Sequence, residues 1–102
     1  MRSANINHVS EGERVLHTKK KFLHKLKGCP GYPFNEYEDG AFFYYVYEEY
    51  PYVDLISELD KKTAWWKKHP NALAEGGKFH RAQLDEWFQL ENEYQAKKWG
   101  GV

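Results

Sequence analysis

This chain of 102 residues is poor in cysteine and in long apolar runs, and its middle third lacks positive charge. Its only cysteine is Cys29, so no disulfide can form within the chain, and the usual Cys/His zinc spacings cannot be assembled around it. The longest uncharged aromatic stretch, 41–47, is too short to cross a bilayer, and the first residues contain no apolar run of signal-peptide length. We therefore expect a protein of the reducing cytoplasm that makes no use of a membrane.

Positive charge is missing from residues 35–60, which hold eight acidic residues and no lysine or arginine. Residues 1–34 carry seven bases against two acids, and residues 61–102 carry eight bases against five acids. The net charge of zero therefore hides blocks of about +5, −8 and +3. Such sorting predicts a basic surface and an acidic, tyrosine-rich surface that face different partners, which is typical of a binding protein rather than an enzyme.

What the chain does have is aromatic residues, which make up 18% of it. Each buried Phe, Tyr or Trp removes about 150–250 Å² from water, so aromatic rings can replace scarce aliphatic side chains in a core. The length allows one core and not two. We expect a single compact, all-α, four-helix domain over 1–102 with an aromatic core, in which 1–9 and 100–102 are flexible.

The first predicted helix begins after Ser10, which forms a Ser-x-x-Glu capping box with Glu13, and it runs to Leu26. Its apolar face holds Val15, Leu16, Phe22, Leu23 and Leu26, and its opposite face holds Arg14, His17, Lys20, Lys21, His24, Lys25 and Lys27. Residues 28–33 contain two prolines and two glycines, which end this helix.

The second predicted helix covers 36–50, with Asn35 as its N-cap. Its buried stripe at helical spacing is Phe43, Val46, Tyr47 and Tyr50. On this pattern Tyr45 lies on the opposite, exposed side among acidic residues. A strand over 42–47 is the alternative because these residues have high β-propensity, but they lack polar alternation.

The third predicted helix follows the N-cap Asp54 and ends before His69 and Pro70. Its stripe is Leu55, Ile56, Leu59, Thr63 and Trp66. Trp65 projects about 100° away from this stripe, which makes it a candidate contact residue.

Residues 71–78 are predicted to form a loop with a Gly-Gly hinge, followed by a fourth helix over 80–98. The expected inward residues of this helix are Leu84, Trp87, Phe88, Leu90 and Tyr94. Glu91 falls within that stripe, so either the helix lies at the edge of the core or Glu91 pairs with a base.

Three segments together carry a family resemblance. They are Tyr-Pro-Tyr-Val-Asp-Leu-Ile-Ser-Glu-Leu at 50–59, Trp-Trp at 65–66 and Arg-Ala-Gln-Leu-Asp-Glu-Trp-Phe at 81–88. Their order resembles a short helical module of phage and prophage DNA-replication proteins of the helicase-loading or replisome-organising kind. In that module a Pro-x-Val/Ile-Asp-Leu helix with a Trp precedes a basic linker and an Arg-x-x-x-x-x-Trp helix. The resemblance implies a helical accessory protein that works with nucleic acid or with a nucleic-acid-processing complex.

The first functional interpretation is a phage-type accessory protein in which basic side chains meet phosphates and Trp65 stacks on an unpaired base. The candidate nucleic-acid-binding residues are Lys19, Lys20, Lys21, Lys25, Lys27, Lys61, Lys62, Trp65, Lys68 and Arg81, with Lys67 beside them. The alternative is that these lysines only solvate helix faces. The resemblance ranks this interpretation first.

The second interpretation is an inhibitor or adaptor that binds a protein through an acidic aromatic face and competes with nucleic acid on a basic partner. Its candidate residues are Glu38, Tyr44, Tyr45, Glu48, Glu49 and Tyr52. The alternative is that most of these tyrosines belong to the core or its rim. Exposure of more than two of these candidate tyrosines on one face would weaken that alternative.

An enzyme is the third class, and no residue pattern favours it. His17 and His24 are seven residues apart, about 10 Å along a helix, which is too far to share a metal ion. Cys29 has no triad context, and adjacent acids such as Asp85 and Glu86 point to different sides of a helix. We expect no catalysis, no metal and no cofactor, and the sequence sets no oligomeric state.

Overall fold

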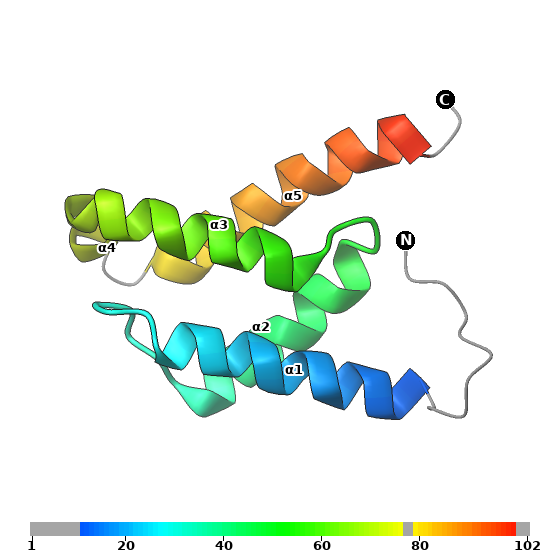
Figure 1. Cartoon of the computed structure of the whole chain (residues 1–102), viewed down its shortest axis with the longest axis horizontal. Coiled ribbons are helices and arrows are strands. Elements are labelled where there is room, and N and C mark those ends of the chain that lie inside the picture. The colour runs from blue at the N-terminus through cyan, green and yellow to red at the C-terminus, as the bar shows by residue number, and fades with distance from the viewer. Residues whose placement is uncertain (1–10, 77–78, 100–102) are drawn as a thin grey trace.

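The computed structural model describes residues 11–76 and 79–99, which form five helices (Figure 1). The helices are α1 (Glu11–Lys27), α2 (Glu36–Glu49), α3 (Leu55–Lys68), α4 (Pro70–Gly76) and α5 (His80–Trp99). The residues described contain no strand, which confirms the all-α prediction and shows that the strand alternative for 42–47 is wrong. The ends that we expect to be flexible, 1–9 and 100–102, lie outside the described residues, as does the predicted cap Ser10.

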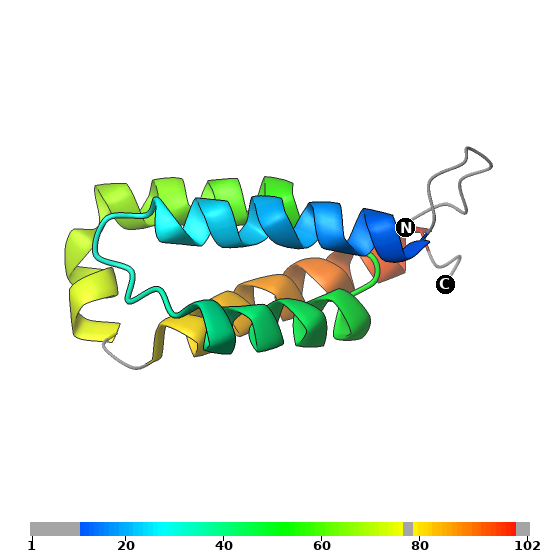
Figure 2. The same ribbon diagram turned by 90° about the horizontal axis from the view of Figure 1, so that it is seen from below.

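The helices stack in two layers. In one layer α1 and α3 run side by side in the same direction, and in the other α2 and α5 run the opposite way, while the short α4 lies at one end (Figure 2). Between the layers, α1 packs on α2 and α3 packs on α5. The core therefore lies between the two pairs of helices.

Two predicted caps determine where helices begin. The side chain of Asn35 accepts a hydrogen bond from the backbone N–H of Glu38 at 2.8 Å, and Asp54 accepts one from Ser57 at 3.1 Å. Each bond satisfies an N–H that has no partner within its own helix. Both predicted N-caps are confirmed.

The predicted loop over 71–78 is wrong for residues 71–76, which belong to α4, and its remaining residues, 77–78, are not described. Pro70 suits the first position of a helix because its fixed φ is already helical and it needs no donor there. Leu73 is buried and lies against Gly31, where an added Cβ would come within 3.0 Å of Leu73 Cδ2. Gly31 also has a φ of 83°, which favours glycine, so α4 is held by packing that local sequence does not reveal.

The predicted aromatic core is confirmed. The ring of Phe22 lies 5.3 Å from that of Phe43 and 6.2 Å from that of Phe88, measured between centroids. Such tilted ring pairs add about 0.5–1.5 kcal/mol to the effect of burial. The predicted stripe residues that are buried are Phe22, Leu26, Phe43, Val46, Tyr47, Tyr50, Leu55, Leu59, Trp66, Leu84 and Phe88.

Three predicted core residues, Leu16, Leu90 and Tyr94, are exposed instead. Leu16 lies about 100° around α1 from the line of its buried residues. The other two lie in the second half of α5, which at 1.5 Å per residue is about 30 Å long against about 21 Å for α3. The backbone N–H of Tyr52, shortly before the start of α3, donates to the side chain of Asn92 at 2.9 Å. The turns of α5 that follow Asn92 therefore extend past the start of α3.

Candidate functional site

A buried polar cluster around Asp39 joins α2, α5 and the segment between α1 and α2. Asp39 is fully buried and accepts hydrogen bonds from the Tyr32 hydroxyl and, at 2.9 Å, from the Asn35 backbone N–H. Arg81 binds it with two parallel bonds, Nε to Oδ1 at 2.9 Å and Nη2 to Oδ2 at 2.8 Å. Burial, and then the bond to Asp39, raise the pKa of Tyr32. The cluster holds α2 against the start of α5.

Sequence reasoning missed this cluster and assigned Arg81 to phosphate contact. Arg81 also lies 3.4 Å from a carboxylate oxygen of Glu38, so its guanidinium faces two acids of its own chain. The available signal was the position of Asp39 four residues before Phe43, on the buried stripe of α2. A buried carboxylate on such a stripe requires a base.

Lys62 is a second base that the fold holds inside. The residue is 7% exposed, and its Nζ lies 4.3 Å from the ring centroid of Trp65, 5.4 Å from that of Trp66 and 5.0 Å from that of Trp87. Burial lowers the pKa of Lys62. Its ammonium is enclosed by three indoles, the arrangement by which proteins hold organic cations.

The rings around Lys62 are themselves held in place. Trp87 donates its indole N–H to Glu58 at 3.1 Å, and Trp66 donates to Gln83 at 3.2 Å. Trp65, the predicted stacking residue, is stacked on the ring of His69 at 4.2 Å. One face of Trp65 is therefore occupied by His69.

Three further candidate bases have partners within the chain. Lys25 Nζ lies 2.6 Å from Asp60, and Lys61 Nζ lies 2.9 Å from Glu58. Lys19 Nζ lies 4.5 Å from the centroid of the Tyr44 ring and donates to its hydroxyl at 3.4 Å. Surface ion pairs of this kind are weak, but they reduce the positive charge offered to a phosphate backbone.

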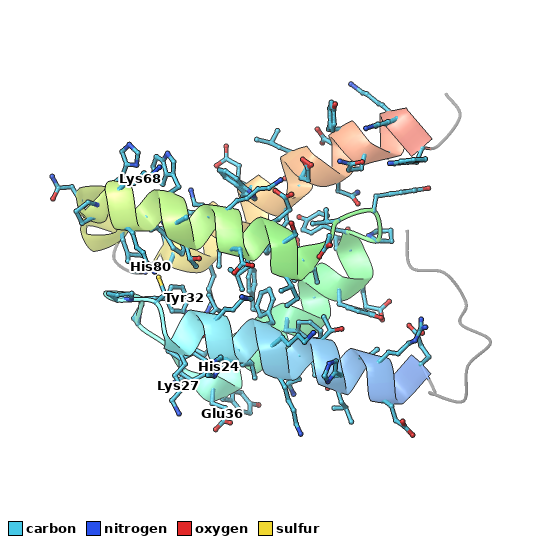
Figure 3. The ribbon with its side chains drawn as sticks, in the orientation of Figure 1. His24, Lys27, Tyr32, Glu36, Lys68 and His80 are labelled. Atoms are coloured by element: carbon cyan, nitrogen blue, oxygen red, sulfur yellow. The ribbon has the colours of Figure 1, made fainter. Side chains whose placement is uncertain are left out.

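Besides Lys61, the candidate bases that remain exposed are Lys20, Lys21 and Lys27 on α1 with Lys67 and Lys68 on α3, and Lys97 and Lys98 at the end of α5 are exposed as well. None of the three α1 lysines forms an ion pair with a described residue. Lys27 lies at the lower edge of the molecule and Lys68 at the upper edge, so the ends of α1 and α3 do not bring these two together (Figure 3). The exposed bases are therefore divided between the outer side of α1 and the C-terminal ends of α3 and α5.

The candidate protein-binding residues of α2, unlike the candidate bases, are gathered on one exposed helix face. Tyr44 and Tyr45 are 42% and 46% exposed, and Tyr37, which sequence reasoning missed, is 87% exposed. At 100° per residue they fall within about 140° of one another around α2 together with three of its exposed acids, Glu38, Glu48 and Glu49. We call this surface the α2 outer face, and its residues are Tyr37, Glu38, Tyr44, Tyr45, Glu48 and Glu49. Tyr37 could have been found because it lies one turn before Ala41 and two turns before Tyr44.

Tyr52 lies beyond the end of α2 and belongs to a different place. It is half-buried and lines a groove of about 540 Å³ with the start of α3 and the second half of α5. Glu91 also lines this groove and accepts a hydrogen bond from Gln95 at 3.2 Å. The expectation that α5 lies at the edge of the core near Glu91 is confirmed.

The residues that could support catalysis are dispersed or enclosed. His17 and His24 are exposed on α1, and burial raises the pKa of the Cys29 thiol. Buried His80 lies next to Tyr32 (Figure 3) and donates from Nε2 to the Leu73 carbonyl oxygen at 2.7 Å. Within the described ranges, no three His, Cys, Asp or Glu side chains gather closely enough to hold a metal ion.

The part of the chain that the structure describes has no helix with the length and apolar character needed to span a bilayer. Comparisons with protein-family models, with curated proteins and with solved structures give no match for this chain.

Proposed function

We propose that this chain is a non-enzymatic binding protein whose α2 outer face engages a basic surface on a partner protein. The observation that carries the proposal is the gathering of three exposed tyrosines with exposed carboxylates on one helix face. Tyrosine supplies a large contact area at a low cost in side-chain entropy, and carboxylates steer the approach of a basic partner. Of the three tyrosines that the sequence assigned to this face, Tyr44 and Tyr45 are exposed and Tyr52 is half-buried elsewhere, so the third exposed tyrosine is Tyr37.

The rigidity of α2 supports the proposal. Phe43 and Val46 are fully buried on its inner side, and Asp39 is bonded to Arg81 of α5. A surface that is already ordered before binding loses little conformational entropy on association. The outer face is therefore suited to a stable contact.

The chemistry of the face defines the class of partner. Carboxylates along one side of a helix present negative charge in a row, as a nucleic-acid backbone does, and the basic grooves of nucleic-acid-processing proteins are complementary to both. An inhibitor or adaptor that competes with nucleic acid for such a groove fits this pattern. The buried free thiol of Cys29 is compatible with action in a reducing cytoplasm.

A capture experiment with nuclease treatment tests the proposal. The wild-type chain is immobilised and used to capture proteins from a cell lysate, with and without nuclease. It is compared with a Tyr44→Ala/Tyr45→Ala/Glu49→Lys variant and, as the control on α1, with a Lys20→Glu/Lys21→Glu/Lys27→Glu variant. We expect one protein to be retained by the wild type and the α1 variant, to be lost with the α2 variant, and to resist nuclease. Loss of the protein on nuclease treatment, or its retention by the α2 variant, contradicts the proposal.

A second candidate function is association with nucleic acid by a phage-type accessory protein, favoured by Lys20, Lys21 and Lys27, which are exposed and form no ion pair with a described residue. A mobility shift with single- and double-stranded DNA and RNA tests it at low and at physiological salt. Phosphate contacts require binding that falls steeply with salt and disappears with the triple glutamate variant. Binding that is absent even at low salt excludes this function.

A further inference from the structure

The groove beside the second half of α5 has a composition suited to organic cations. It lies at the end of the molecule where α5 turns away from the other helices (Figure 1), and its volume is about 540 Å³, within the usual range for ligand sites. Three carboxylates and three aromatic side chains line it, namely Asp54, Glu58, Glu91, Tyr47, Tyr52 and Trp99. No lysine or arginine is among the described residues that line it.

The carboxylates of the groove retain capacity to accept hydrogen bonds. Asp54 receives one bond from the Ser57 backbone, and Glu91 receives one from Gln95. Glu58 is buried and receives bonds from Trp87 and from Lys61, a base that also interacts electrostatically with Asp54 and Glu91 and neutralises part of the charge. Because an ionised carboxylate accepts about four hydrogen bonds, Asp54 and Glu91 can also bind an ammonium or guanidinium group.

The aromatic walls provide the second component of a cation site. Trp99 is exposed, and its indole N–H donates to Gln95 at 2.9 Å, which orients the ring along α5. An arginine or lysine side chain gains from contact between its apolar stem or charged head and such a ring. Lys98 Nζ lies 5.8 Å from the centroid of the Trp99 ring, so an arriving basic side chain replaces this contact. The rings and carboxylates that line the groove therefore suit the two parts of the same side chain.

A neighbouring hollow of about 260 Å³ shares Glu58 and Glu91 with the groove, and its other lining residues are the apolar Trp87 and Leu90. Leu90 and Tyr94 are exposed on the same half of α5. Glu91 thus lies beside the exposed apolar side chains of Leu90 and Tyr94 on this helix. A peptide that carries apolar side chains next to basic ones can cover both, which a free amine cannot.

We propose that the groove binds arginine or lysine side chains of a basic, amphipathic peptide segment of a partner protein. This site goes beyond the α2 outer face, because none of the residues of that face is among those that line the groove. The two proposals therefore stand or fail separately.

Calorimetric titration with a blocked amphipathic peptide of leucine and arginine tests this site. The matched variants are Glu91→Gln, which removes a groove charge, and Glu93→Gln, which removes the same charge from an exposed position on the opposite side of α5. We expect Glu91→Gln to weaken binding about tenfold, as for one charge-assisted hydrogen bond, and Glu93→Gln to leave it unchanged. A peptide with citrulline in place of arginine should not bind.

A second variant, Trp99→Ala, is expected to weaken peptide binding while the thermal midpoint stays unchanged, since Trp99 lies outside the core. Equal weakening by Glu91→Gln and Glu93→Gln, or equal binding of the citrulline peptide, contradicts the proposal. Tighter binding of spermidine than of the peptide also overturns it, because the ligand would then be a free polyamine. A dimer that Tyr94→Lys disrupts would overturn it as well, since a second copy would cover this half of α5.

Discussion

The basic and the acidic side chains of this protein are used in different ways. Lys62 is buried among three tryptophans, Arg81 is half-buried against Asp39, and Lys25 pairs with an acid of its own chain. Four of the eight acids of residues 35–60 pair with bases of the chain, so charge counted along the sequence overstates both charged surfaces. Glu48 and Glu49, however, remain exposed on the same helix face as exposed tyrosines.

The difference has a physical basis in the length of the side chains. Lysine and arginine can bury an apolar stem while the charged head finds an aromatic ring or a carboxylate. A glutamate on the outer side of a helix has a short stem and gains nothing by turning inward. Bases near a core can therefore be drawn toward it by their stems, whereas the buried acids Asp39 and Glu58 are each bonded to a base.

The largest expected effect is that of Arg81→Ala. This change leaves Asp39 buried without its base, which costs about 3–5 kcal/mol of stability in comparable buried pairs. Lys68→Ala, at an exposed position, is the control and should change stability by less than about 0.5 kcal/mol. Urea denaturation measures both, and equal small effects would show that Arg81 is not a structural residue.

The next largest effect is expected at Lys62. Lys62→Ala removes the stem and the ammonium from between three tryptophans and should cost about 2 kcal/mol. Lys62→Met keeps most of the stem, so it should lower the free energy of unfolding clearly less than Lys62→Ala does. Urea denaturation followed by tryptophan fluorescence compares the two, and a loss as great for Met as for Ala would contradict packing as the main role of the stem.

Alkaline pH should have a smaller, graded effect. Burial, and then hydrogen bonds to Asp39 and Asp85 respectively, raise the pKa of Tyr32 and of Tyr50 above the unfolded value of about 10. The folded state therefore retains these protons longer than the unfolded state, so their contribution is complete below about pH 10 and is lost as the pH rises further. In Tyr32→Phe, the urea midpoint should fall less steeply with rising pH than it does in the wild type. An unchanged slope would contradict the raised pKa of Tyr32 in the folded state.

The smallest effect on stability is expected on the α2 outer face. Tyr37→Ser and Glu49→Lys replace exposed side chains, so each should change the unfolding free energy by less than about 0.5 kcal/mol. Thermal unfolding measures this. A larger loss would mean that the face is part of the structural framework and not free for a partner.

The parts of the fold that local patterns predict are those that depend on local interactions. Asn35 and Asp54 were identifiable as caps, and the stripe from Phe43 to Tyr50 identified the inner side of α2. In contrast, α4 depends on Leu73 meeting Gly31, more than 40 residues away in the sequence. Local periodicity carries no information about such contacts.

Local patterns also predict only part of the candidate sites. The exposure of Tyr44 and Tyr45 followed from their helical positions, since one side of α2 was already assigned to the core. The enclosure of Lys62 and Arg81 depends on which helices become neighbours, and the exposure of Tyr94 depends on α5 being longer than α3. These facts come from the packing of helices that are distant in sequence.

The most direct test of the account is site-specific photo-crosslinking in cells, with a photoreactive amino acid in place of Tyr45 or, in a separate chain, of Lys20. The account predicts a discrete protein adduct from position 45 and none from position 20. A nucleic-acid adduct from position 20, with no adduct from position 45, would contradict the claim that this protein acts through the α2 outer face.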